Sequence, residues 1–207
     1  MIRRILKLVV ATAALAGCSL TGVNPSASGP AGLPTAGGCP TAQPPAMSAG
    51  ETRSVTIETA NGKIVIKVDG TLSPIAAGNF VALASCGFYD GVDFHRVATL
   101  ADGTPFVIQG GAREGEPGYT IQDEPVTATY GRGTVAMART QEANSQDSQF
   151  FIVMSDAAGP VLASYNTYAI FGTVIEGMDV ADAIYAAADG ELPSHPIAMD
   201  RVIVSSP

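Results

Sequence analysis

The chain has 207 residues, of which 46% are hydrophobic and 14% are charged, and this composition can bury the core of one compact domain. The formal net charge of -8 and the pI of about 4.6 leave no basic surface to neutralise phosphates, which argues against a nucleic-acid partner. The 23 glycines and 14 prolines favour short strands and turns over a helical bundle.

The N-terminus has the pattern of a secretory signal. A basic start precedes a short apolar run, residues 8–16, which is too short to span a bilayer. The run ends in Leu15-Ala16-Gly17-Cys18, which is similar to the lipobox of bacterial lipoproteins, where the cysteine receives a diacylglycerol. We therefore predict a signal peptide over residues 1–17 and lipidation of Cys18. The alternative is an ordinary secretory signal with an incidental cysteine.

A segment without charged residues follows the predicted lipidation site. Between Ser19 and Ser48 the sequence consists mainly of Pro, Gly, Ala, Ser and Thr, which bury too little surface to offset the entropy of ordering. We predict that residues 18–50 are a flexible tether and that residues 51–207 form the folded domain. This organisation predicts a protein outside the cytoplasm, anchored to the cell membrane by the lipid on Cys18.

The folded part begins with a predicted hairpin and a helix. Apolar and polar residues alternate over residues 55–57 and 64–68, on either side of Asn61-Gly62, which is typical of a two-residue type I′ turn. Ser73-Pro74 then offers an N-cap and a first-turn proline. Apolar residues recur at helical spacing from there to Gly87, which predicts a helix of about three turns.

Several short apolar runs follow, separated by loops rich in Gly, Asp and Asn. They cover residues 94–97, 106–109, 134–137, 149–154 and 168–173, with a second helix expected over 178–187 and a last strand over 197–204. About eight strands and two helices predict a mainly β fold, a closed eight-stranded antiparallel β-barrel capped by two α-helices, because closure removes exposed edges.

Five short motifs lie in these runs. They are Phe94-His95-Arg96, Phe106-Val107-Ile108-Gln109-Gly110-Gly111, Ala136-Met137-Ala138-Arg139, Ser148-Gln149-Phe150-Phe151-Ile152 and Tyr168-Ala169-Ile170-Phe171-Gly172. Each motif is common alone, but in this order, from about Val55 to Val204, they closely resemble the cyclophilin family of peptidyl-prolyl cis/trans isomerases. The resemblance implies a cyclophilin-like fold, activity on proline-containing polypeptides, and a monomer without cofactor or metal.

The residue types fit this reaction. An X-Pro peptide bond rotates slowly because its C–N bond has partial double-bond character, with a barrier of about 18–20 kcal/mol. A catalyst needs an apolar pocket for the proline ring and a hydrogen-bond donor that favours the twisted amide. By resemblance, Arg96 is this donor, Gln109 holds the substrate backbone and braces Arg96, and Phe106 completes the catalytic set. The substrate-binding residues implied are Val107, Ala138, Arg139, Gln149, Phe151, Leu162 and Tyr168.

Each assignment has a structural alternative. Arg96 at a strand end is compatible with a solvated charge, and Phe106 and Phe151 with ordinary core packing. We expect His95 to be structural and hydrogen-bonded, because amide rotation needs no proton transfer. The two histidines and three cysteines form no recognisable metal motif. Acidic residues near the C-terminal helix, Asp182, Asp189 and Glu191, have the pattern of a solvated face.

The two cysteines left after Cys18 form an even pair. In an oxidising compartment Cys39 and Cys86 are expected to form a disulfide that pins the end of the tether to the end of the first helix. The alternative is one thiol buried in the helix and one unpaired in the linker.

The leading functional hypothesis is an isomerase that assists the folding of secreted or cell-envelope proteins. The rival is a membrane-tethered proline-peptide binding module or holdase chaperone with little turnover. A third reading, a barrel lipoprotein that carries a small apolar ligand, requires a roomy interior, and large apolar residues on nearly every strand argue against one. Retention of Arg96 with Phe106, Gln109 and Phe151 favours the enzyme.

Overall fold

The computed structural model describes residues 38–206. The predicted signal peptide, Cys18 and residues 18–37 of the predicted tether lie outside the described residues. Within the described range, no helix combines the length and the apolar character needed to cross a membrane.

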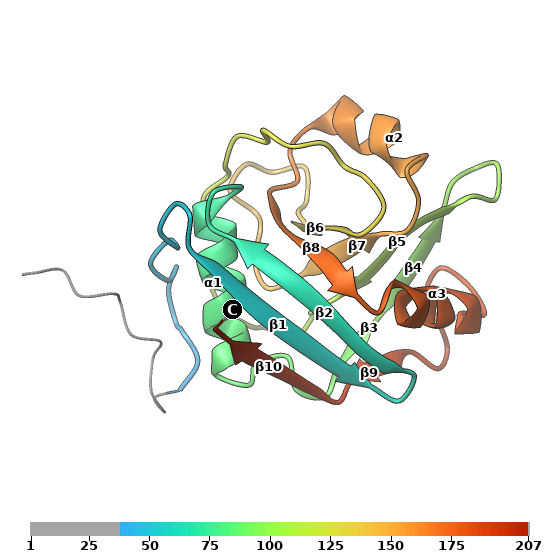
Figure 1. Cartoon of the computed structure of the whole chain (residues 1–207), viewed down its shortest axis with the longest axis horizontal. Coiled ribbons are helices and arrows are strands. Elements are labelled where there is room, and N and C mark those ends of the chain that lie inside the picture. The colour runs from blue at the N-terminus through green and yellow to red at the C-terminus, as the bar shows by residue number, and fades with distance from the viewer. Residues whose placement is uncertain (1–37, 207) are drawn as a thin grey trace, which may run out of the picture. The chain divides into compact units, whose positions relative to one another are not determined.

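The described residues form a mainly β domain with three helices (Figure 1). In chain order the elements are β1 (Thr52–Thr59), β2 (Gly62–Asp69), α1 (Pro74–Ser85), β3 (Val92–Phe94), β4 (Arg96–Thr99), β5 (Pro105–Gly110), β6 (Thr134–Met137), β7 (Phe150–Val153), α2 (Ala158–Tyr165), β8 (Ile170–Glu176), α3 (Met178–Ala187), β9 (Ile197–Met199) and β10 (Arg201–Ser205). Eight strands pair antiparallel in the order β10-β1-β2-β8-β6-β7-β5-β4, and β3 pairs with β9 in a separate ladder.

The eight-stranded sheet differs from the predicted barrel in how its edges meet. Its outer strands, β10 and β4, do not pair with each other in the described part of the chain. Instead, one residue, His95, separates the end of β3 from the start of β4, and one residue, Asp200, separates β9 from β10. The β3–β9 ladder therefore connects the two edges, and each of two apolar runs predicted as one strand is divided into two.

The first hairpin forms as predicted, but its turn lies one residue earlier. Thr59 pairs with Gly62, so the turn residues are Ala60 and Asn61, and Gly62 begins β2 with a φ of 129°. The Thr59 hydroxyl accepts a hydrogen bond from the Asn61 amide and donates one to the Gly62 carbonyl. This side chain stabilises the turn in place of the expected type I′ pair.

Helix α1 matches the prediction except at its N-cap. The Ser73 hydroxyl makes no capping hydrogen bond. The Glu124 carboxylate instead accepts hydrogen bonds from the amides of Ile75 and Ala76, each at 2.8 Å. Because the first amides of a helix have no partner within it, this distant carboxylate satisfies them and complements the helix dipole.

The sheet has apolar residues on both faces, and β7 contributes to each of two clusters. Phe150 and Ile152 belong to the main core together with Phe80 of α1, whose ring centroid lies 5.1 Å from that of Phe150. Phe151 and Val153 belong to a second cluster on the opposite face. Helix α2, which the sequence analysis did not predict, covers this second cluster with Ala158 and Leu162.

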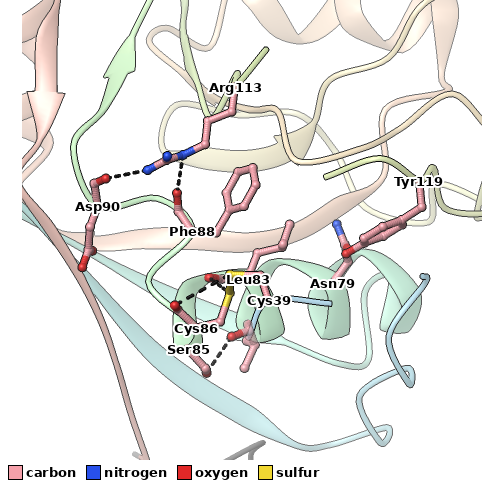
Figure 2. The surroundings of a disulfide bond; sticks show 10 residues. Cys39, Asn79, Leu83, Ser85, Cys86, Phe88, Asp90, Arg113 and Tyr119 are labelled. Carbon is pink, nitrogen blue, oxygen red and sulfur yellow. Dashed lines mark hydrogen bonds between the residues drawn. A yellow bond between two sulfur atoms is a disulfide. The ribbon is translucent and has the colours of Figure 1, made fainter. Parts of the chain in front are cut away.

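Residues 38–50 differ from a free tether, because part of this segment packs on the domain. Cys39 and Cys86 form the disulfide expected from the sequence, at the C-terminal end of α1 (Figure 2). Met47 is part of the main core, and its amide donates to the Pro74 carbonyl at 2.9 Å. A Cβ on Gly78 would overlap the Pro45 carbonyl, so glycine permits this close approach. The packed part of the chain therefore begins before residue 51.

Candidate active site

Strand pairing places three of the predicted site residues in one row. Arg96 of β4 lies opposite Gln109 of β5, and Gln109 lies opposite Phe151 of β7. Paired residues of antiparallel strands point to the same face of a sheet. All three side chains therefore lie on the face of the second apolar cluster.

A β-bulge turns two consecutive residues of β5 towards this face. Ala98 pairs with Val107, but the next residue, Thr99, pairs with Pro105, so Phe106 is the extra residue. A bulge of this kind redirects side chains that would otherwise alternate between faces. Phe106 and Val107 consequently both line the same pocket.

The predicted site residues converge on a pocket of about 120 Å³. Its lining residues are Arg96, Phe106, Val107, Gln109, Ala138, Arg139, Phe151, Leu162 and Tyr168. Gln149 is the one predicted site residue that does not line it. The Gln149 side chain lies behind Gln109 and accepts a hydrogen bond from Gln109 Nε2 at 3.1 Å. Gln149 therefore contacts the pocket residue Gln109 and does not itself line the pocket.

Apolar and aromatic side chains form the floor and one wall of the pocket. The Phe151 side chain is 4% exposed, and its ring meets that of Tyr168 edge to face at a centroid distance of 5.4 Å. Leu162 closes the wall from α2. The Tyr130 hydroxyl donates to the Tyr168 carbonyl at 2.9 Å, and burial raises the pKa of Tyr130 to about 12. The pocket is thus shaped for a compact apolar ring.

The polar edge of the pocket is held by a chain of side-chain hydrogen bonds. Arg96 Nη1 donates to Gln109 Oε1 at 3.3 Å, and Gln109 in turn donates to Gln149. This arrangement fixes the rotamer of Gln109 and brings its amide next to the guanidinium. The predicted bracing of Arg96 by Gln109 is thus present in the geometry.

Glu191 is a partner of Arg96 that the sequence analysis missed. Its Oε1 accepts from Arg96 Nε at 2.8 Å and lies 2.7 Å from Arg96 Nη2. The sequence analysis placed Glu191 on a solvated face, and the carboxylate is indeed accessible, but it faces the guanidinium. The two residues are 95 positions apart, so no local motif connects them.

Ala138 and Arg139, which directly follow β6, also line the pocket. The Ala138 amide donates to the Gln149 carbonyl at 2.8 Å. The guanidinium of Arg139 is bound by the Asp123 carboxylate at 3.1 Å and by the Glu142 carbonyl. Arg139 therefore braces the loop between β6 and β7 with its charged end.

His95 and Gly111 show two local constraints beside the site. Burial lowers the His95 pKa, and hydrogen bonding to the Asp93 backbone and the Gln149 side chain acts in the opposite direction, which agrees with the structural histidine expected. Gly111 adopts a φ of 92°, and a Cβ there would lie 2.6 Å from the Ser148 carbonyl oxygen. Only glycine is accommodated at that position.

Within residues 38–206, no group of three or more His, Cys, Asp or Glu side chains is arranged to hold a metal ion.

Comparison with known proteins relates this site to a family. A family model described as cyclophilin type peptidyl-prolyl cis-trans isomerase/CLD matches residues 54–204. Peptidyl-prolyl cis-trans isomerase A of Dickeya dadantii is 38% identical over 151 residues, which cover 70% of this chain and 77% of that protein. Peptidyl-prolyl cis-trans isomerase B of Escherichia coli is 36% identical over 168 residues, which cover 73% of this chain and 99% of that protein.

Solved structures give the same relationship. The crystal structure of a cyclophilin type peptidyl-prolyl cis-trans isomerase of Cryptosporidium parvum is similar with a TM-score of 0.63 and 26% sequence identity, over 75% of this chain and 99% of that chain. A second crystal structure of that isomerase, in the presence of the dipeptide Ala-Pro, is similar with a TM-score of 0.61, over 74% of this chain and 99% of that chain.

Proposed function

This chain belongs to the cyclophilin family of peptidyl-prolyl cis-trans isomerases, and from this premise we propose that it isomerises X-Pro bonds in secreted or cell-envelope proteins while anchored to the membrane by a lipid on Cys18. Its activity is that of a peptidyl-prolyl cis-trans isomerase, and its ligands are proline-containing polypeptides. The assignment of the site rests on the pocket that Arg96 lines together with Phe106 and Phe151.

In the proposed mechanism, the proline ring occupies the apolar pocket and Arg96 acts on the amide. The pocket between Phe106, Phe151 and Leu162 holds the ring, which fixes one side of the C–N bond. As the amide twists, its nitrogen loses conjugation and becomes a better hydrogen-bond acceptor, so a guanidinium N–H binds it more strongly than in the planar ground state. Gln109 holds the flanking backbone. The reaction breaks no covalent bond and needs no proton transfer.

The experiment that tests the site measures turnover of a short X-Pro peptide by the parent and by Arg96→Ala. Loss of one preorganised donor commonly lowers the rate about 100- to 1000-fold. Because the interaction strengthens in the transition state, kcat should fall far more than peptide affinity. Arg53→Ala, which removes an arginine that does not line the pocket, is the matched control and should keep the parent's kcat.

Two outcomes would contradict this proposal. A folded Arg96→Ala variant with the parent's full rate would exclude Arg96 as the donor. A parent that binds proline peptides without measurable turnover would favour the alternative of a binding module or holdase. Thermal melts of both variants are needed to separate chemistry from folding, and Arg96→Ala should melt near the parent because its guanidinium lies at the surface of the pocket.

The anchoring part of the proposal rests on Leu15-Ala16-Gly17-Cys18 and on the uncharged segment after it. Mass spectrometry of the protein from the membrane fraction should find Cys18 as the first residue, carrying acyl chains. Cys18→Ala should release the protein from the membrane fraction and leave isomerase activity unchanged. A mature protein that begins elsewhere, or a Cys18→Ala variant that stays in the membrane fraction, would overturn the proposal.

A further inference from the structure

The segment between α3 and β9 docks along the outer side of β4, the strand that carries Arg96. Because β4 is an edge strand of the eight-stranded sheet, its outward N–H groups have no partner strand. The Val97 amide donates to the Glu191 carbonyl at 2.8 Å. Further along β4, the Thr99 hydroxyl lies 2.6 Å from the Tyr185 hydroxyl of α3. The backbone of Glu191 is therefore fixed one residue away from Arg96.

The loop that carries Glu191 is also closed on itself. The Asp189 carboxylate accepts hydrogen bonds from both the amide and the hydroxyl of Ser194. These bonds hold the loop in a compact turn around Glu191, which limits the positions that its side chain reaches. The bond from Val97 to the Glu191 carbonyl and the closed turn between Asp189 and Ser194 thus together hold the Glu191 carboxylate next to the guanidinium.

Glu191 restricts which N–H groups of Arg96 remain for a substrate. A guanidinium has five N–H groups in a rigid plane. Glu191 takes the Nε–H and one Nη2–H, and Gln109 takes one Nη1–H. Each terminal nitrogen keeps one N–H without a partner in the described part of the chain. With both edges of the plane held, the guanidinium has little freedom to rotate away from the pocket.

We propose that Glu191 is a positioning residue for the isomerase reaction, which orients the Arg96 guanidinium so that its remaining N–H groups face the amide nitrogen of the substrate. This inference rests on the proposed role of Arg96. Glu191 does not line the pocket itself, so it acts through Arg96 and not by contact with the peptide. Orientation of a donor matters for the rate because the donor must be in place when the amide twists.

The position of the pair at the surface provides a specific signature. The side chains of Arg96 and Glu191 are 35% and 62% exposed, so dissolved ions reach them. The screening length falls from about 10 Å at 0.1 M salt to about 3 Å at 1 M salt. The parent enzyme should therefore lose rate as salt weakens the pair, whereas a variant without the carboxylate has no such pair to lose.

The test compares the parent with Glu191→Ala and Glu191→Gln in a peptide isomerisation assay. We expect Glu191→Ala to lower kcat by about fivefold, the upper range for an exposed ion pair, with KM nearly unchanged. Glu191→Gln keeps an acceptor oxygen and should lie between the two. Glu176→Ala is the matched control, because Glu176 is an exposed glutamate on β8 whose side chain makes no ion pair in the described part of the chain.

Two further measurements distinguish positioning from a purely structural role. Raising salt to about 1 M should bring the parent's kcat close to that of Glu191→Ala, while the variant's own kcat changes little. In NMR spectra the Nε–H resonance of Arg96 should be protected from exchange in the parent and in Glu176→Ala, and lose this protection in Glu191→Ala.

The outcomes separate this inference from the function on which it rests. A parent without turnover would refute the proposed function itself. An active parent whose kcat is matched or exceeded by folded Glu191→Ala would refute the positioning role, and a gain in rate would show that Glu191 instead restrains Arg96. Parallel salt profiles of parent and Glu191→Ala would refute it as well.

Discussion

Removal of the Cys39–Cys86 disulfide should destabilise the domain but leave the pocket working. The two cysteines are 47 positions apart, so the bond closes a long loop that contains β1, β2 and all of α1. For a loop of this length the chain-entropy relation gives about 4 kcal/mol at 25 °C. Replacing both cysteines by alanine should therefore lower the free energy of unfolding by about 3–4 kcal/mol.

The assay is urea denaturation of the full-length chain, with the parent, the double alanine variant and the parent reduced by dithiothreitol. The two perturbed forms should unfold at the same, lower urea concentration. For a domain of this size the loss corresponds to a melting temperature lower by roughly 6–16 °C. Neither cysteine lines the active pocket, so kcat/KM of the folded variant should equal that of the parent.

Two results would refute this reasoning. A double variant that unfolds at the parent's urea concentration would show that closing this loop adds nothing to the free energy of unfolding. Lost activity at unchanged stability would show that the disulfide region is coupled to the pocket, for example through Phe88 and Arg113, which lie next to it (Figure 2).

Three other substitutions test the packing and electrostatics around the site. Phe151→Ala should cost about 3–5 kcal/mol of stability, because the ring is buried, and should raise KM as well as lower kcat; urea titration and peptide kinetics check this. Gly78→Ala should displace residues 45–47 from α1, and hydrogen exchange at the Met47 amide should then increase although the helix itself prefers alanine. Burial lowers the His95 pKa below 6.5, so the unfolded chain binds more protons than the folded chain below that pH. The free energy of unfolding should therefore fall as the pH drops through 6.5, and level off below the folded-state pKa. Urea titrations of His95→Gln should show a flatter pH dependence.

The elements with a regular apolar pattern were predictable from sequence. The hairpin of β1 and β2 follows from strict alternation, and α1 and α3 follow from helical spacing. The turn of the hairpin moved by one residue because the Thr59 hydroxyl stabilises it, a side-chain effect that the Asn-Gly pattern does not include. The local apolar pattern thus predicted which elements form more accurately than it predicted the residues at which they begin and end.

Helix α2 was not predictable in this way. Its eight residues include Gly159 and Pro160, which are poor helix formers, and it contains no charged residue. The helix forms because Ala158 and Leu162 cover the second apolar cluster, and because Gly159 lets it approach the Tyr130 carbonyl. These are tertiary contacts, so the family resemblance implied Leu162 as a wall residue while the local sequence pattern did not indicate its helix.

Composition alone predicts that residues 38–50 belong to the tether, because it describes them as unable to form a core. Their packing depends on a few specific contacts: the disulfide at Cys39, the burial of Met47 and the close approach to Gly78. A segment with so little apolar surface is held by partners elsewhere in the domain. Composition therefore indicates whether a segment can fold by itself, but it does not indicate whether contacts with the rest of the domain will order it.

The same distinction explains which parts of the pocket were predictable. Arg96, Gln109 and Phe151 share a row because strand pairing is periodic, so motifs in successive strands are brought together wherever the register holds. Glu191 has no such periodic relation to Arg96. The Val97 amide on the exposed edge of β4 donates to the Glu191 carbonyl, and the loop that carries Glu191 is closed by the hydrogen bond between Ser194 and Asp189. The Glu191 backbone docks beside β4 next to Arg96, and this docking brings the carboxylate of a residue from the loop after α3 to the Arg96 guanidinium.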